Sequence, residues 1–119
     1  MLQINKGESK SWYLTLTEKV TIANPKFLFV FVNRLTNSET AVILTDVSQY
    51  KERYNQFNVI EGTTFTLDPC EHLYQVYEQS SNSNLKPLNA TLIEVGILKV
   101  TEIFQEQTEY NPTLIEKTL

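Results

Sequence analysis

Cysteine, histidine and glycine are scarce in this chain, which has one cysteine, one histidine and three glycines among 119 residues. A single cysteine excludes an internal disulfide and a zinc site built from several cysteines. Three glycines leave no P-loop and no G-x-G-x-x-G motif for a phosphate group. The sequence also lacks a G-x-S-x-G elbow and a D-x-D-x-D calcium loop. We therefore expect no enzyme, no cofactor and no metal site.

Clustered positive charge and long apolar runs are also missing. The ten Lys and Arg residues are scattered and the net charge is −4, whereas a nucleic-acid binder usually carries a concentrated basic face. No segment reaches the roughly 20 apolar residues of a membrane-spanning helix. Residues 1–10 lack the apolar stretch of a signal peptide. We expect a chain made in a cytoplasm that binds neither nucleic acid nor membrane.

What the sequence has in quantity is alternation of apolar and polar residues. In 11–17 this period of two places Trp12, Leu14 and Leu16 on one side, which is typical of a half-buried strand. The segment 26–33, KFLFVFVN, is apolar on both sides. Such a run predicts a central strand that is covered on both faces.

Further segments with strand-like patterns follow along the chain, at 40–46, 57–68, 70–79 and 90–104. Gly62 marks a turn or bulge that divides the second of them into two short strands. In the last one, Ile93, Val95 and Ile97 would share a face. Gly96 indicates either a bulge or the close approach of another backbone.

Residues 47–56 interrupt the alternation. Tyr50 and Tyr54 are four residues apart, the spacing of one helix face, and Ser48 can cap a helix. The pattern predicts a helical turn there.

The number and spacing of these segments predict the fold class. Six or seven strands with frequent turn signals in about a hundred residues are typical of an all-β, immunoglobulin-like antiparallel β-sandwich. We expect N- and C-terminal arms on this sandwich. The sandwich domain would span 1–104 and the C-terminal arm 105–119.

The lone cysteine and histidine, Cys70 and His72, are two residues apart and would point to the same face of a strand. A thiolate–imidazolium nucleophile also needs an orienting group and oxyanion donors, and no glycine-rich turn accompanies this pair. The structural alternative is a corner at Asp68 and Pro69, in which the ring of His72 bonds to backbone upstream. We expect this corner and an inert thiol.

The residues 105–119 show no clear period. They mix glutamates with Tyr110, Leu114 and Ile115, which a purely disordered tail would rarely carry together. We expect an arm in which these three side chains anchor on a neighbouring subunit. The alternative is that the tail folds back on its own domain or frays.

Several patterns occur together in one order: INKG at 4–7, LTLTEK at 14–19, NPKFLFVFVN at 24–33, YQVYEQ at 74–79 and GILKV at 96–100. In this order they resemble small virion proteins of tailed bacteriophages, and they are similar in plan to the N-terminal β-sandwich module of phage upper-baseplate proteins. The resemblance implies an immunoglobulin-like sandwich that binds other virion subunits, and it brings no catalytic residues. Related patterns commonly carry glycine where this chain has Cys70.

The resemblance implies a non-enzymatic structural protein of a phage virion, made in the host cytoplasm. We expect an auxiliary or decoration protein of the capsid first, and an adaptor for fibre or tail components second. Its partners would be the major capsid protein or fibre and tail subunits, with self-association as a further option.

Two other classes of function are open. One is a free-standing module that binds carbohydrate or a host protein, and the other is a small enzyme that uses Cys70 and His72. A carbohydrate platform made of Trp12 and Tyr13 is disfavoured, because adjacent residues of a strand point to opposite faces.

Overall fold

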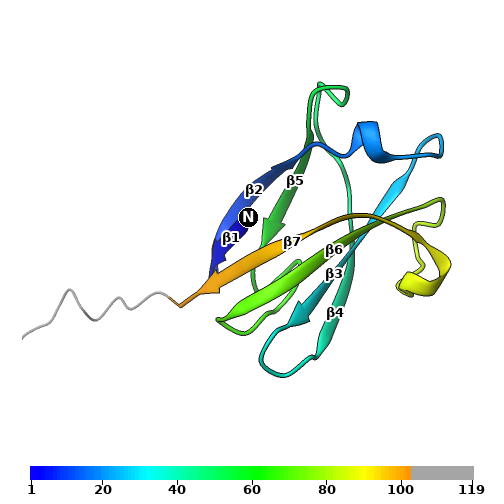
Figure 1. Ribbon diagram of the computed structural model, residues 1–119. Coiled ribbons are helices and arrows are strands. Elements are labelled where there is room, and N and C mark those ends of the chain that lie inside the picture. The colour runs from blue at the N-terminus through cyan, green and yellow to red at the C-terminus, as the bar shows by residue number, and fades with distance from the viewer. Residues whose placement is uncertain (103–119) are drawn as a thin grey trace, which may run out of the picture.

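The computed structural model describes residues 1–102, which form seven β-strands and two short 3-10 turns (Figure 1). The strands are β1 (Leu2–Asn5), β2 (Ser9–Leu14), β3 (Lys26–Asn33), β4 (Glu39–Leu44), β5 (Asn55–Ile60), β6 (Glu71–Gln79) and β7 (Thr91–Thr101). The turns are η1 (Thr17–Lys19) and η2 (Pro87–Asn89). The prediction of an all-β fold with about seven strands is confirmed for this part of the chain.

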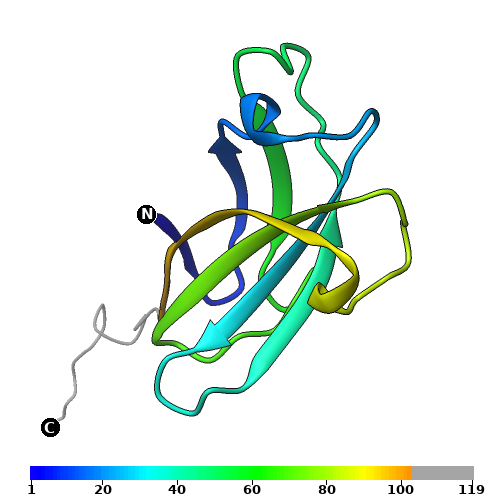
Figure 2. The same ribbon diagram turned by 45° about the vertical axis from the view of Figure 1, so that its right-hand side comes forward.

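The strands form two sheets whose inner faces pack together (Figure 2). The large sheet has the order β1-β7-β6-β3-β4, and the small sheet consists of β2 and β5. Every neighbouring pair is antiparallel except β1 and β7, which are parallel. The large sheet is therefore mixed, and the prediction of a purely antiparallel fold is wrong.

The expectation of an N-terminal arm is also wrong, because these residues form β1. Leu2 and Ile4 are buried, and they pair in parallel with Leu98 and Val100 of β7. Pairing satisfies the backbone hydrogen bonds of the segment and buries its two apolar side chains at once. The partner strand lies almost a hundred residues away in the sequence. The pattern of residues 2–5 alone therefore does not indicate a strand.

The strand β3 lies between β6 and β4 and has the predicted bounds, 26–33. Its phenylalanines point at the small sheet. The ring centroids of Phe29 and Phe57 are 5.0 Å apart, and those of Phe31 and Trp12 are 6.1 Å apart. Edge-to-face contacts of this kind make the centre of the core.

The other side of β3 is buried as well. Leu28 and Val30 alternate with the phenylalanines and have exposed fractions of only 0% and 1%. The prediction of a strand covered on both faces is therefore confirmed.

The turn before β5 follows the prediction. Ser48 Oγ accepts a hydrogen bond from Tyr50 N at 3.0 Å. Tyr50 O in turn accepts bonds from the backbone N–H groups of Arg53 and Tyr54. These contacts make a single helical turn with Ser48 as its cap.

The prediction of a second strand after Gly62 is wrong. Gly62 has a φ of 95° and its N–H donates to Phe65 O at 2.6 Å, so the chain closes a tight turn with only an isolated bridge between Glu61 and Phe65. Phe65 nevertheless stacks on Trp12 at 5.7 Å. The apolar residue at position 65 therefore packs in the core and does not belong to a paired strand.

A bulge changes the faces of β7. The register shifts between Val76 and Tyr77 of β6, which leaves Ile93 as an extra residue of β7. Ile93 packs against the core, whereas Val95 and Ile97 lie on the opposite side of the sheet. The prediction that these three residues of β7 share a face is therefore wrong.

Gly96 is required by a close neighbour. A Cβ atom at this position would lie 2.4 Å from the ring of Tyr74, too near for any side chain unless the ring moved. The sequence predicted the close approach of another backbone, whereas the close neighbour is the side chain of Tyr74. The bulge lies three residues earlier, at Ile93.

A buried carboxylate fastens the β1–β2 turn to the segment between β5 and β6. Glu61 accepts hydrogen bonds from Lys6 Nζ at 2.7 Å, Gly7 N at 2.8 Å and Leu67 N at 3.2 Å. Burial acts to raise the pKa of the Glu61 carboxyl, but these hydrogen bonds and the charge of Lys6 outweigh it and hold the pKa below its usual 4.5. Glu61 is therefore ionised at neutral pH.

Replacing Phe29 with alanine tests the core. The ring is fully buried, so its loss leaves a cavity and should lower the free energy of unfolding by about 3–5 kcal/mol. Chemical denaturation followed by circular dichroism measures the change. Tyr13→Ala removes an exposed ring and should cost under about 1 kcal/mol. An unchanged denaturation midpoint for Phe29→Ala would contradict the assignment of β3 as the core strand.

Glu61 should make the fold sensitive to acid. A carboxyl whose pKa is lower in the folded chain stabilises that chain above the unfolded pKa, near 4.5, and the contribution is lost as pH falls through the folded pKa. Glu61→Gln should cost about 1–3 kcal/mol at neutral pH, because Lys6 and two N–H groups lose a charged acceptor.

The same substitution should flatten the loss of stability below pH 4.5. Thermal unfolding across a pH series measures both effects, and Glu18→Gln, at an exposed position, serves as the control. If Glu61→Gln kept the full acid dependence, another carboxyl would have to be responsible.

Candidate functional site

The corner before β6 holds the lone histidine in a structural role. His72 is buried, and its Nε2 lies 2.9 Å from Asp68 O. A carbonyl oxygen can only accept, so Nε2 carries the hydrogen and donates it. The predicted corner, with its ring bonded to backbone upstream, is confirmed.

Cys70 is not arranged as a nucleophile. Its Sγ lies 3.6 Å from His72 Nε2, the nitrogen that already donates to the backbone. Burial, together with the charges of Asp68 and Glu71, raises the pKa of the Cys70 thiol above 9.0, against a hydrogen bond from Asn33 that lowers it. The described residues hold no group of three or more His, Cys, Asp or Glu side chains that could bind a metal ion. His72 Nδ1 is buried without a hydrogen-bond partner among residues 1–102, but the thiol lies against Nε2, so the arrangement does not pair a thiolate with a base.

The three side chains expected to anchor on a neighbour are not among the described residues. Tyr110, Leu114 and Ile115 lie beyond residue 102. Their role remains a prediction from the sequence.

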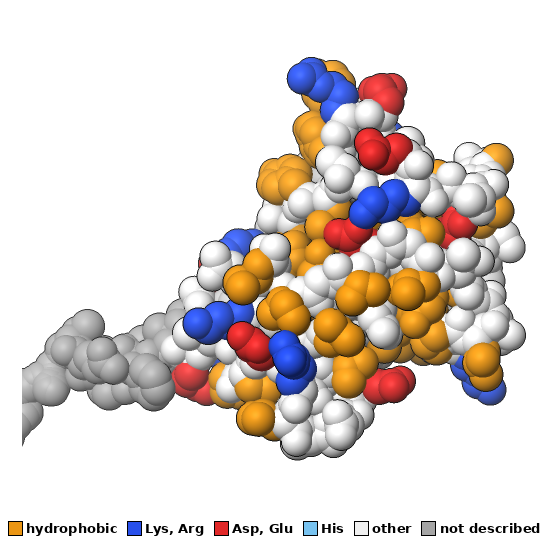
Figure 3. Space-filling model, viewed as in Figure 1, with side chains coloured by type: hydrophobic (Ala, Val, Ile, Leu, Met, Phe, Trp, Pro, Cys, Tyr) orange, Lys and Arg blue, Asp and Glu red, His pale blue; other side chains and the backbone are white. Residues whose placement is uncertain are grey.

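The most distinctive surface is the outer face of the large sheet, the side turned away from β2 and β5. Its members come from four adjacent strands and are almost all apolar. This outer face consists of Leu28, Val30, Val32, Ala41, Ile43, Leu73, Gln75, Tyr77, Leu92, Val95 and Ile97. Figure 3 shows hydrophobic side chains gathered over β7, β6 and β3. Leu92 and Val95 are its most exposed members, and exposed apolar side chains that lie together can mark a protein interface.

Strand register explains how the outer face is built. Leu28 lies between Ile43 of β4 and Tyr77 of β6, whose side chains flank it from both sides. On β7 the side chains of the outer face are less buried by their neighbours, and Leu92 and Val95 are 46% and 49% exposed. The side chains at the centre of the outer face are therefore shielded from solvent, and those along β7 are exposed to it.

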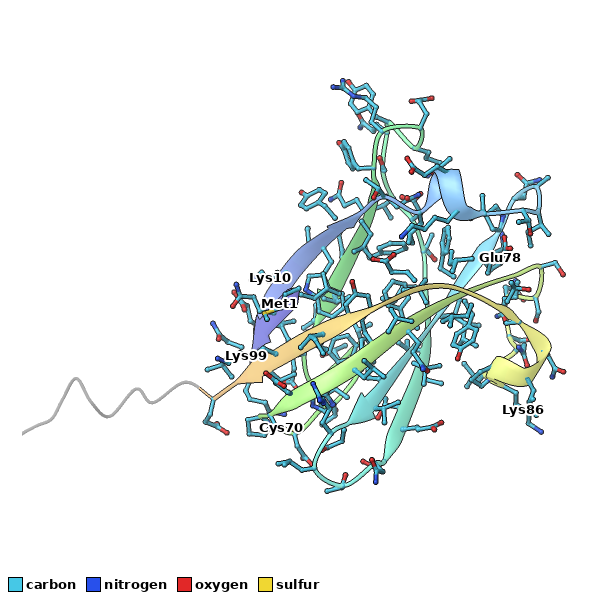
Figure 4. All side chains as sticks on the ribbon, in the orientation of Figure 1. Met1, Lys10, Cys70, Glu78, Lys86 and Lys99 are labelled. Atoms are coloured by element: carbon cyan, nitrogen blue, oxygen red, sulfur yellow. The ribbon has the colours of Figure 1, made fainter. Side chains whose placement is uncertain are left out.

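Charged side chains border one end of the outer face. Arg34 Nη1 lies 3.4 Å from Glu71 Oε1, and Glu71 pairs in register with Lys99 of β7. Glu39 lies on β4 beside Val32. In Figure 4, Lys99 and Cys70 mark this end of the sheet, and Glu78 marks the opposite end of β6. The signs alternate along the border, from Glu39 through Arg34 and Glu71 to Lys99.

A cluster of tyrosines forms a second exposed feature, at the end of β2. The ring of Tyr54 lies 5.6 Å from that of Tyr13 and 6.4 Å from that of Tyr50, measured between centroids. Tyr13 and Tyr50 are exposed, whereas Trp12 is buried in the core. Trp12 and Tyr13 thus point to opposite faces, as the sequence predicted, and the partners of Tyr13 come from the turn before β5.

A cavity of about 680 Å³ opens at the end of β4. Phe27 and Leu44 form part of its apolar wall, and Asp46, Lys51 and Asn55 form part of its polar wall. The polar groups bind one another: Asn55 Nδ2 donates to Asp46 Oδ2 at 2.7 Å, and Lys51 Nζ lies 3.6 Å from the same oxygen. These contacts hold Asp46, Lys51 and Asn55 together within the chain.

In comparisons with known proteins, no family model matches the chain and no curated protein is significantly similar to it. Within the described residues, no helix is long and apolar enough to cross a membrane.

Thiol labelling tests the assignment of Cys70. Because the pKa of this thiol is raised, iodoacetamide should react slowly at neutral pH, and the rate should increase with pH and level off at a higher pH than for an ordinary thiol. N-acetylcysteine, labelled in parallel, gives the rate of an unhindered thiol. Fast labelling at neutral pH, together with loss of function in Cys70→Ser, would instead identify a reactive cysteine.

Proposed function

We propose that this chain is a non-enzymatic structural subunit of a tailed-bacteriophage virion. It serves as an auxiliary or decoration protein of the capsid, or as an adaptor for fibre or tail components. It binds other virion proteins through the outer face of its large sheet. The observation that carries this proposal is the apolar composition of that face across four strands.

Physical chemistry favours a protein partner for the outer face. Exposed Leu92 and Val95 gain free energy when they leave water, by about 25 cal/mol for each Å² of apolar surface buried. The face has no catalytic or metal-binding group, and its polar border can set orientation. The assignment to a phage virion depends on the resemblance of the strand patterns described above.

The assignment of the two sheets to an immunoglobulin-like fold is part of this proposal. In an immunoglobulin-like domain, β3, β6 and β7 would correspond to strands C, F and G, β4 to C′, and β2 and β5 to B and E. His72 then lies near the start of strand F, where the corner tyrosine of such domains bonds to backbone upstream. The small sheet has only two strands, fewer than a complete immunoglobulin sheet.

A second candidate function is a module that binds carbohydrate or a host protein. The exposed cluster of Tyr13, Tyr50 and Tyr54 favours it, because tyrosine rings offer apolar stacking area together with a hydroxyl group. This cluster belongs to the β2–β5 part of the molecule and not to the outer face.

Purified particles of the encoding virus test the proposal. We expect peptides of this chain in a fixed ratio to the major capsid protein, measured by quantitative mass spectrometry. Val95→Glu places a charge on the outer face and should lower incorporation at least about tenfold, since burying an unpaired charge is costly. Ile60→Glu is the matched control, because Ile60 is 44% exposed on a strand of the small sheet.

Absence of the chain from particles, or equal incorporation of both variants, would contradict the proposal. Glycan binding that is lost in Tyr13→Ala and unchanged in Val95→Glu would support the second candidate instead.

A further inference from the structure

We infer that the outer face joins two copies of this chain, related by a two-fold axis that runs parallel to the strands between β3 and β6. The inference rests on the proposed function, because it names the partner of the same surface. A two-fold interface must be complementary to itself, so the face can be tested for this property strand by strand.

The position of the axis follows from the strand order. The outer face is made by β7, β6, β3 and β4, so its midline lies between β6 and β3. Rotation about this line places β3 of one copy over β6 of the other, and β4 over β7. Two sheets packed face to face keep their strands within about 30° of each other, so this pairing of strands is retained.

The apolar positions match under this rotation. Leu28 of one copy and Tyr77 of the other occupy the same row of the register, and because Leu28 has no exposed surface, the half-buried Tyr77 makes the contact in this row. In that row Ile43 lies over Leu92. The β7 side of the face, which is the most open, is thereby covered by β4.

Of the two polar residues at the centre, Tyr77 is satisfied within one copy, whereas the described residues offer the Gln75 amide nitrogen no acceptor, and its burial weakens the contact. Gln75 pairs in register with Val30, and Tyr77 Oη donates to Gln75 Oε1 at 3.2 Å. These two side chains bond to each other within one copy, so the apolar contact does not leave the Tyr77 hydroxyl without an acceptor.

The charged border selects this axis over its alternative. Arg34 of one copy lies over Glu71 of the other, and Glu39 lies one outer-face row from Lys99. Arg34 and Glu71 therefore each meet the opposite charge, whereas Glu39 lies over Ile97, next to the row of Lys99. A two-fold axis across the strands would instead place Arg34 over Lys26, which occupies the other end of β3, and like charges would repel.

The size of the face sets the expected affinity. Four strands about 4.8 Å apart and six positions of about 3.3 Å give a face of roughly 20 Å by 20 Å. Two such faces cover about 800 Å², and Leu28 and Val30 at their centre have almost no exposed area left to bury, so the interface belongs to the small, weak class. We therefore expect a reversible dimer with a dissociation constant in the micromolar range.

Sedimentation velocity of the full chain from about 1 to 300 µM tests the inference. The wild-type chain should pass from monomer to dimer over this range. Val95→Glu should weaken the dimer at least about tenfold, and the matched variant Ile60→Glu should associate like the wild type.

A charge-swap mixture identifies the axis. Arg34→Glu and Glu71→Arg should each weaken the homodimer, because each variant sets like charges against each other. Mixed in equal amounts, the two variants should form a heterodimer. One copy is then acidic at both border positions and the other is basic at both, so each contact across the axis joins opposite charges. Thermal unfolding of each variant shows that the monomer stays folded.

Several results would overturn the inference. A wild-type chain that stays monomeric throughout, or a dimer that Val95→Glu leaves intact, contradicts it directly. Failure of the two charge variants to associate when mixed contradicts the axis. If the chain is monomeric but Val95→Glu still blocks incorporation into particles, the dimer is wrong and the proposed function stands. If neither association nor incorporation depends on Val95, the dimer and the proposed function are both wrong.

Discussion

The structure depends on one strand that is apolar on both sides. Alternation along β3 directs Phe27, Phe29 and Phe31 to one face of the large sheet and Leu28 and Val30 to the other. The two strands of the small sheet cover only the phenylalanine face. The other face therefore remains apolar and is closed only by neighbouring side chains. One eight-residue strand thus accounts for the core and for the surface proposed to bind a partner.

Buried polar side chains position the segments between strands. Asn55 Oδ1 accepts a hydrogen bond from Leu16 N at 2.6 Å, Glu78 Oε1 accepts one from Thr21 N at 2.8 Å, and Glu61 holds the β1–β2 turn. Each of these groups is buried and each is satisfied by the chain itself. These three side chains therefore fix the path of the chain between the strands.

Much of the fold could be predicted because its signals are local. The bounds of β3, the helical turn after Ser48 and the corner at His72 each depend on residues a few positions apart. The pairing of β1 with β7 and the extra residue Ile93 depend on strands distant in sequence, which no local period reveals. The outer face was missed for the same reason, since assigning Val95 to a surface required the sheet order and the bulge.

Hydroxyl-radical footprinting of the assembled protein tests the central claim most directly, because it reports which side chains become covered. Tyr77 lies on the outer face, whereas Tyr13 and Tyr50 lie in the exposed cluster beyond it. The account predicts that Tyr77, with Leu73 and Val95, loses reactivity when the chain associates, while Tyr13 and Tyr50 stay as reactive as in the dilute monomer. Protection of Tyr13 and Tyr50 with an unchanged outer face would contradict it.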